Sequence, residues 1–391
     1  MRRGNRPLAA LLAAWCLALG PAAAGLPAGE VPAVVPAASV QAAAVQAAAD
    51  PGAQLAKLTL EQRVGQVLMA GVPAAGADQS TLATITKYEV GNIFLKGRSS
   101  KGTAATRAVL RRLEATVSAT TTGGIRRFTA TDQEGGYVQV LSGKGFSKMP
   151  TALAQGRWPA ATIRAKAKAW ARQLRSAGVT VNLAPVADVV PQAGAASNAP
   201  IGRFEREFGY TAASVATDAT AFARGMADGG VAPVLKHFPG LGRVTGNTDT
   251  AVGVTDTRTT RTDANLKPFR SGIRAGARWV MVSSAYYRRI DAKRIAAFSP
   301  TVLKTMLRKD LGFTGIIVSD DLCDAAQLSP WSYAERAVKF FSAGGTMLLC
   351  VNAKAVPAMH KALAAQARKD PAFRAKLNAA ALEVLQTKAG Q

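Results

Sequence analysis

Histidine and cysteine are scarce in this chain of 391 residues, which has two histidines, His237 and His360, and three cysteines. No cysteine or histidine pair has the spacing of a zinc site. The sequence also lacks a Gly-x-Gly-x-x-Gly turn after a strand-like run, a Walker loop and a Gly-x-Ser-x-Gly elbow. We therefore expect no metal and no cofactor. The remaining candidates for chemistry are carboxylates, lysine, arginine and histidine.

Acidic residues are also few, with 24 Asp and Glu against 49 Lys and Arg, which gives a net charge of +25. The basic residues are spread along the chain, and aromatic residues make up only 6% of it, so stacking platforms for single-stranded nucleic acid are poorly supplied. We expect no nucleic-acid partner. Attraction to an anionic surface, such as an acidic cell-wall polymer or lipid head groups, is the expected use of this charge.

The N-terminus has the pattern of a secretory signal peptide. Residues 1–6 are basic, residues 8–19 form an apolar run too short for a dependable membrane span, and residues 21–24 are small. We expect cleavage after residue 24, which removes Cys16, and export of a chain without a transmembrane segment to the cell wall or the medium. Residues 25–54, rich in Ala and Pro, are expected to form a disordered linker.

The rest of the chain alternates strand-like apolar runs with stretches of helical spacing. Thr59 to Gln62 has the form of a capping box for a first helix. The apolar runs are residues 67–70, 90–95, 128–131, 179–184, 231–235, 279–282, 316–318 and 347–351. The helical stretches include residues 106–118, 160–176, 213–228, 300–310, 333–343 and 353–387. Eight repeats of strand and helix predict an α/β protein with a single (β/α)8 TIM-type barrel domain over residues 55–391, expected to be a monomer.

Polar residues follow the predicted strands, where a parallel barrel carries its active site. Carboxylates, amides, Lys236 and His237 would converge on one rim. The run 316–318 ends on Ser319, Asp320 and Asp321. Successive side chains of a strand point to opposite sides, so we expect Asp320 to face the pocket and Asp321 to support it. The alternative is that Asp321 caps the next helix and Asp320 is a solvated loop acid.

Two cysteines, Cys323 and Cys350, remain after removal of the signal peptide. In an exported chain, an even pair can form a disulfide, and the alternative is two buried free thiols. Because these cysteines follow or end the seventh and eighth strand runs, which are neighbours in a barrel, we predict a bridge beside Asp320.

Four motifs resemble those of glycoside hydrolase family 3, in the branch of single-domain β-N-acetylhexosaminidases. They are residues 132–136 (DQEGG), 206–209 (REFG), 236–240 (KHFPG) and 313–322 (FTGIIVSDDL). The resemblance covers residues 55 to 388 and implies a retaining β-glycosidase with a covalent glycosyl-enzyme intermediate on Asp320. It also implies that the sugar at the non-reducing end is bound by Asp132, Arg206, Lys236 and His237. For His237, the alternative is a histidine at a strand end whose hydrogen bonds are made within the protein and which does not contact a ligand.

One departure from the family pattern concerns the general acid/base. The branch has Asp-Ser-His in the loop after the KHFPG motif, and its final His is the acid/base. Here Asn247, Thr248 and Asp249 stand at these places, and Leu241 replaces another family His. We predict that Asp249 is the acid/base, because a carboxylic acid can serve if its pKa is raised toward the working pH. The alternative is that Asp249 is an acid of the loop without a catalytic role, and that protonation of the leaving group is impaired.

A second departure lies after Gly136, where Tyr137 and Val140 stand at two places that are usually Arg in the branch, so two guanidinium groups near the sugar are missing. The leading prediction is an exported β-N-acetylhexosaminidase that acts on cell-wall-derived sugars with terminal N-acetylglucosamine. The alternatives are a β-glucosidase of the same family and a carbohydrate-binding protein without catalytic activity.

Overall fold

The computed structural model describes residues 50–390. The predicted signal peptide and residues 25–49 of the predicted linker lie outside the described residues. Helix α1 (Pro51–Lys57) begins within the predicted linker, so residues 51–54 are helical. The Asp50 carboxylate accepts a hydrogen bond from the Ala53 amide at 2.9 Å, and a proline at the first helical position needs no amide partner.

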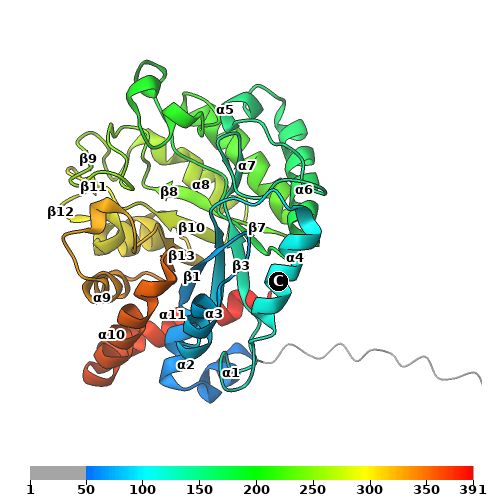
Figure 1. Ribbon diagram of the computed structural model, residues 1–391. Helices are drawn as coiled ribbons and strands as arrows, with labels where there is room; N and C mark the ends of the chain where they lie inside the picture. Colours follow the sequence, from blue (N-terminus) through cyan, green and yellow to red (C-terminus); the bar gives the residue numbers. More distant parts are fainter. Residues whose placement is uncertain (1–49, 391) are drawn as a thin grey trace, which may run out of the picture. The chain divides into compact units, whose positions relative to one another are not determined.

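Parallel strands form the centre of the described chain (Figure 1). One six-stranded sheet has the order β14 (Leu348–Cys350), β1 (Leu68–Pro73), β2 (Asn92–Lys96), β3 (Phe128–Thr131), β6 (Val181–Asn182) and β7 (Ala232–Pro233). A three-stranded sheet has the order β13 (Ile316–Ser319), β10 (Trp279–Val282) and β8 (Leu235–Phe238). Each predicted strand run overlaps one of these strands, and the fifth run reaches from β7 into β8.

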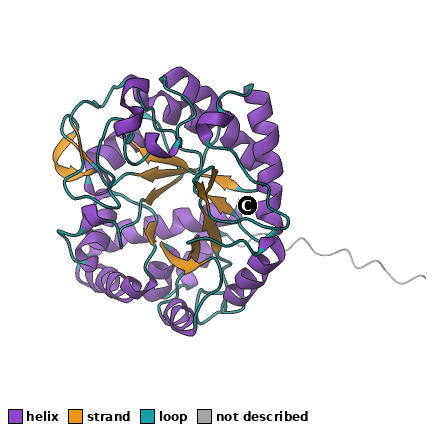
Figure 2. Cartoon of the chain, turned by 45° about the horizontal axis from the view of Figure 1, so that its top comes forward, coloured by secondary structure: helices purple, strands orange, loops and turns teal. Residues whose placement is uncertain are grey.

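The two sheets are connected on both sides. Strand β7 continues into β8 through Val234 alone. On the other side, Val318 and Met347 form a parallel bridge, and the Ser319 amide donates to the Met347 carbonyl at 3.0 Å. Figure 2 shows the strands surrounded by helices. The predicted parallel α/β architecture is confirmed.

Helices alternate with the strands and cover them on the outside. They are α2 (Leu60–Gln66), α3 (Gln79–Lys87), α4 (Gly102–Glu114), α5 (Ala152–Gln155), α6 (Ala160–Ser176), α7 (Ala212–Asp228), α8 (Lys267–Arg274), the π-helix η5 (Thr301–Asp310), α9 (Tyr333–Ala343), α10 (Val356–Lys369) and α11 (Pro371–Ala389). The predicted capping box of α2 is present, with hydrogen bonds of 3.1 Å in both directions between Thr59 and Gln62. Helix α4 begins and ends four residues earlier than predicted. Beyond its end, Thr116 and Ser118 bond to nearby backbone groups, which competes with helix formation.

Shorter elements occupy the loops between the main strands and helices. They are the hairpin β4 (Gln133–Gly135) and β5 (Val138–Gln139), the small sheet β9 (Thr255–Asp256), β11 (Tyr286–Tyr287) and β12 (Asp291–Ile295), and the 3-10 helices η1 (Gln192–Ser197), η2 (Gly202–Phe204), η3 (Ala264–Leu266), η4 (Ala296–Phe298), η6 (Ala326–Leu328) and η7 (Ala353–Ala355). The hairpin and η2 contribute to the lining of the pocket described below, and η6 bonds to one of its loops.

A disulfide joins Cys323 and Cys350, as predicted. Both residues are buried. The bond ties the segment after β13 to the end of β14, next to the strand end that carries Asp320.

Candidate active site

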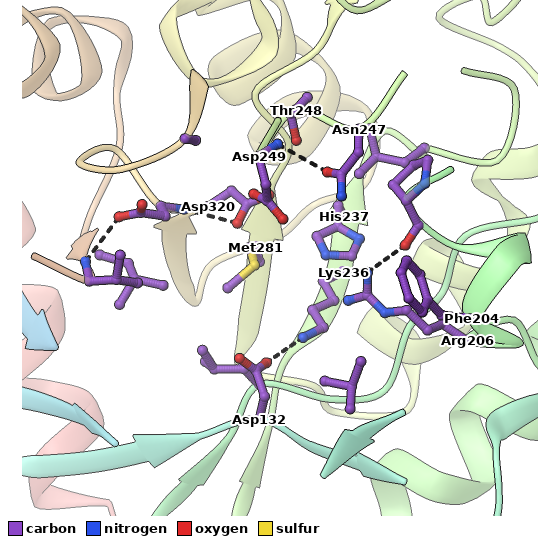
Figure 3. A pocket seen from close by; sticks show the side chains of 18 of the residues that line it. Asp132, Phe204, Arg206, Lys236, His237, Asn247, Thr248, Asp249, Met281 and Asp320 are labelled. Atoms are coloured by element: carbon purple, nitrogen blue, oxygen red, sulfur yellow. Dashed lines mark hydrogen bonds and ion pairs between the residues drawn. The ribbon is translucent and has the colours of Figure 1, made fainter. Parts of the chain in front are cut away.

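A pocket of about 520 Å³ opens at the C-terminal ends of the strands. Its lining includes all six predicted site residues: Asp132, Arg206, Lys236, His237, Asp249 and Asp320. They lie on or after four different strands, and Figure 3 shows their side chains around one space. The structure therefore brings the predicted residues together, while their roles stay predictions.

The floor of the pocket is a buried ion-pair network. The ammonium of Lys236 lies 2.6 Å from a carboxylate oxygen of Asp132 and 2.6 Å from one of Glu134. Arg206 binds Glu134 with two parallel hydrogen bonds of 2.8 Å and donates a third, of 2.7 Å, to the Pro200 carbonyl. Because Lys236 has three N–H groups and Arg206 has five, both retain donors for a ligand.

Burial of Glu134 opposes its ionisation, yet the charges of Arg206 and Lys236 lower its pKa from 4.5 to about 2. A carboxylate whose pKa falls on folding stabilises the fold above its unfolded pKa. This stabilisation is lost as the pH falls from about 4.5 toward 2. Glu134 thus fixes the two cations of the pocket floor at any pH near neutrality.

Replacing Glu134 by Gln is expected to lower the free energy of unfolding at pH 7 by about 3 kcal/mol, the value of a pKa shift from 4.5 to about 2. The difference between wild type and variant should shrink as the pH falls from 5 to 2. Urea unfolding monitored over this range tests the expectation. Glu205→Gln, at an exposed position nearby, is the matched control and should behave as wild type. A pH-independent difference would contradict the account.

His237 is held by Asp188, which follows β6 and is fully buried. The His237 Nδ1 lies 2.7 Å from one Asp188 oxygen, while the other oxygen accepts from the backbone amides of His237 at 3.1 Å and Leu241 at 2.9 Å. With Nδ1 engaged by the carboxylate, Nε2 is the ring nitrogen left for a ligand. This position in the pocket lining fits the predicted ligand contact.

Asp320 and Asp321 divide as the strand alternation predicts. The Asp321 carboxylate accepts backbone hydrogen bonds from Cys323 at 3.0 Å, Asp324 at 2.7 Å and Val351 at 2.9 Å. Asp320 is only partly buried, and one of its oxygens accepts from the Asp321 amide at 2.9 Å. Asp321 therefore supports the loop, which leaves Asp320 with free acceptor capacity at the pocket.

Asp249 lies on the loop after β8, and its side chain lies beside that of Asp320 (Figure 3). Its amide donates to the Asn247 side chain at 3.0 Å, and its carbonyl accepts from the Ala326 amide of η6 at 3.1 Å. A further backbone bond of 3.0 Å joins the Gln327 amide to the Thr248 carbonyl. The two backbone bonds tie this loop to η6.

The surroundings raise the pKa of the Asp249 carboxyl. Removal from water inside the pocket has the largest effect, and the negative charge of Asp320 adds to it. Arg206 and His237 act in the opposite direction but do not outweigh these two causes. Asp249 and Asp320 are thus close enough to interact, and both of these causes favour the protonated form of the Asp249 carboxyl.

Sequence reasoning missed several parts of this pocket. Glu134 and Asp188 belong to stretches that were noted, but neither was predicted as a site residue. Their signal was that both acids belong to polar stretches that follow predicted strands. Two aromatic side chains, Tyr137 and Phe204, also line the mouth, with ring centroids 6.1 Å apart. Both are unusually exposed for large apolar groups, at 59% and 41%.

Two further observations concern residues 50–390. Within this range, no group of three or more His, Cys, Asp or Glu side chains is arranged to hold a metal ion. The helices of the same range include none that is both long and apolar enough to cross a membrane.

Comparison with known proteins identifies the family. Residues 59–387 match the family described as "Glycosyl hydrolase family 3 N terminal domain". The chain is 30% identical over 320 residues to "Beta-hexosaminidase LpqI" of Mycobacterium tuberculosis, covering 79% of this chain and 78% of that protein. It is 37% identical over 230 residues to a "Beta-hexosaminidase" of Methylococcus capsulatus, covering 57% of this chain and 66% of that protein.

A solved structure supports the same assignment. The crystal structure of β-N-acetylhexosaminidase from Beutenbergia cavernae is similar with a TM-score of 0.84 and 50% sequence identity, over 85% of this chain and 98% of that one. The family predicted from the four motifs is confirmed. The chain therefore belongs to glycoside hydrolase family 3 and is a hydrolase of O-glycosyl bonds.

Proposed function

We propose that this protein is a retaining β-N-acetylhexosaminidase. The observation that carries the proposal is the pair Asp249 and Asp320, whose carboxyl groups line the same pocket and lie close enough to interact. A retaining glycosidase needs one ionised carboxylate as nucleophile and one protonated group as acid. The raised pKa of Asp249 beside Asp320 matches this division of roles. The names of the relatives favour an N-acetylhexosamine as the terminal sugar.

In the first step, a carboxylate oxygen of Asp320 attacks the anomeric carbon, and Asp249 gives its proton to the leaving oxygen. The product is a glycosyl ester on Asp320, whose negative charge is lost. The pKa of Asp249 should then fall, because one of the causes that raised it is gone. The ionised Asp249 can now take a proton from water, which attacks the anomeric carbon and releases Asp320 with net retention.

Sugar hydroxyls would bind to the pocket floor. The free N–H groups of Lys236 and Arg206 donate to hydroxyl oxygens, while the Asp132 carboxylate accepts from hydroxyl groups. His237 offers Nε2 because Asp188 holds its other nitrogen. The network fixes these groups before a substrate arrives, which reduces the entropy lost on binding.

We also propose a closed (β/α)8 barrel over residues 55–391, exported by the predicted signal peptide and held near anionic wall polymers by its charge. The connection of β7 to β8 and the Val318–Met347 bridge support closure of the ring. The net charge of +25 supports retention at an anionic surface. A β-glucosidase is the second candidate, because Tyr137 replaces a family Arg. Hydrolysis rates on p-nitrophenyl β-glycosides of N-acetylglucosamine, N-acetylgalactosamine and glucose separate the candidates.

The aromatic pair at the mouth predicts a preference for substrates longer than one sugar. Tyr137 and Phe204 are exposed aromatic side chains of the pocket lining, and the Tyr137 carbonyl accepts a 2.7 Å bond from Arg98, which fixes the turn. Replacing both aromatics by Ala should raise KM for an N-acetylglucosamine disaccharide about 10-fold, since stacking of one ring on an aromatic contributes about 1 kcal/mol or more.

The matched control is a second substrate, methyl β-N-acetylglucosaminide, which has a methyl group in place of the second sugar. The KM of the double variant for this substrate should stay within about twofold of wild type, because the methyl group does not reach the aromatic pair. An equal rise of KM for both substrates would place the effect inside the pocket and contradict a role at its mouth.

A further inference from the structure

A second cavity, of about 370 Å³, lies at the opposite end of strand β3 from the pocket. Asp132 follows the last residue of β3, whereas Phe128 and Thr129 at its beginning line this cavity. Helices α4 and α6, the segment just before β3 and the end of α11 supply the charged part of the lining. The basic residues are Arg107, Arg111, Arg126, Arg127, Arg175 and Lys388, and the one acid is Glu114.

Negative charge in this lining is insufficient to balance the cations. Glu114 pairs with Arg126 at 3.2 Å. Arg107 instead donates to the Ser176 carbonyl at 2.6 Å. The exposed Arg111 and Arg175 project from α4 and α6. The cavity thus carries an excess of positive charge that protein groups in its lining do not neutralise.

One of the cations, Arg127, is buried, and another, Lys388, is partly buried. Arg127 is 5% exposed and donates to the carbonyls of Val90 and Leu113 at 2.8 Å each, while its buried Nη2 has no hydrogen-bond partner among the described residues. The Lys388 ammonium donates to the Gln66 side chain at 2.8 Å and to the Gly91 carbonyl at 3.0 Å. Buried cations are costly unless they are paired.

The pKa values of these groups reflect that cost. Burial lowers the pKa of Arg127 to about 10. Burial lowers the pKa of Lys388 to about 7, and the nearby charge of Arg127 contributes in the same direction. A bound dianion would reverse both effects, because a nearby opposite charge favours the protonated forms. An anion would also provide an acceptor near the unpartnered arginine nitrogen.

We propose that this cavity binds a phosphate group, as free inorganic phosphate or as part of an anionic polymer. Arginine forks match the geometry of phosphate oxygens, and several of them converge on this cavity. The site is separate from the catalytic pocket and does not depend on the proposed function. Through this site, the positively charged chain would bind an anionic polymer at a defined place.

Isothermal titration calorimetry of the full chain at pH 8 and 0.15 M salt tests the proposal. The probes are inorganic phosphate and poly(glycerol phosphate). For whichever probe binds the wild type, the double variant Arg111→Gln/Arg175→Gln should lower the affinity at least 10-fold. The control is Arg112→Gln/Arg172→Gln, which removes the same charge from exposed positions of the same helices outside the lining. It should change affinity less than twofold, since distant surface charges are screened at this salt.

Proton uptake gives a second readout. At pH 8, most Lys388 side chains are neutral if their pKa is about 7, so phosphate binding should take up close to one proton. Measurements in two buffers of different ionisation enthalpy reveal this uptake, and Lys388→Met should abolish it. Equal weakening by both double variants, or binding without proton uptake, would overturn the proposal, as would absence of binding by both probes. Binding of the polymer alone identifies a phosphodiester ligand, and binding of inorganic phosphate identifies the free ion.

Discussion

Replacing Asp320 by Asn is expected to lower kcat by about 10⁴-fold or more, the scale seen when a nucleophile is removed. The amide has the shape of the carboxylate but cannot form the glycosyl ester. Its oxygen can still accept the 2.9 Å bond from the Asp321 amide, so the fold should be retained. Hydrolysis of p-nitrophenyl β-N-acetylglucosaminide measures kcat, and thermal unfolding checks the fold.

Asp324→Asn is the matched control for this experiment. Asp324 lines the same pocket, but its carboxylate accepts a 2.9 Å bond from the Asn352 side chain. The control should reduce kcat only a few fold. If Asp324→Asn and Asp320→Asn had equal effects, or if Asp320→Asn kept its activity, Asp320 would not be the nucleophile.

Replacing Asp249 by Ala should have an effect that depends on the leaving group. For a poor leaving group, such as an alkyl alcohol, kcat/KM should fall about 10²- to 10⁴-fold, the usual contribution of a general acid. For 2,4-dinitrophenol, which departs without protonation, kcat/KM should stay near wild type. Added azide should raise kcat by attacking the glycosyl ester without a general base, with a β-glycosyl azide as product.

Unchanged turnover of the alkyl glycoside by Asp249→Ala would show that Asp249 is not the general acid. A complementary variant restores the usual family loop by Asn247→Asp combined with Asp249→His. This variant should keep measurable activity on the alkyl glycoside, because a histidine at this place can also transfer the proton. Asn247→Asp alone is its control and should leave the leaving-group dependence of wild type unchanged.

Much of the fold could be predicted because the strands are buried on both faces. Ile316, Ile317 and Val318 are fully buried, and such residues leave an uninterrupted apolar run in the sequence. Helix ends were harder to predict where side chains compete for the backbone, as at Thr116 beyond α4. The Cys323–Cys350 bond could be predicted because the order of the strands makes their ends neighbours.

The pocket was predictable where a residue follows a strand directly, as Asp132 and Asp320 do. Glu134 was missed because its position depends on the hairpin of β4 and β5, where Gly135 has a φ of +107° and a Cβ would meet the Pro150 carbonyl oxygen at 2.2 Å. The Tyr137–Phe204 pair joins two loops that are far apart in the sequence. No local pattern encodes such a contact.

The pH dependence of catalysis follows from the same arrangement. Since the acid step needs protonated Asp249 and ionised Asp320, kcat/KM should show a bell-shaped profile. The upper limb reports the raised pKa of Asp249 and should lie above the range of an ordinary aspartate.

Covalent trapping tests the central claim most directly. The protein is incubated with a 5-fluoro derivative of N-acetylglucosaminyl fluoride, which forms the glycosyl ester quickly and hydrolyses it slowly, and the labelled peptide is sequenced by mass spectrometry. We predict one label per chain, on Asp320. Turnover of the p-nitrophenyl substrate without any trapped ester, or a label on Asp249 instead, would contradict the account.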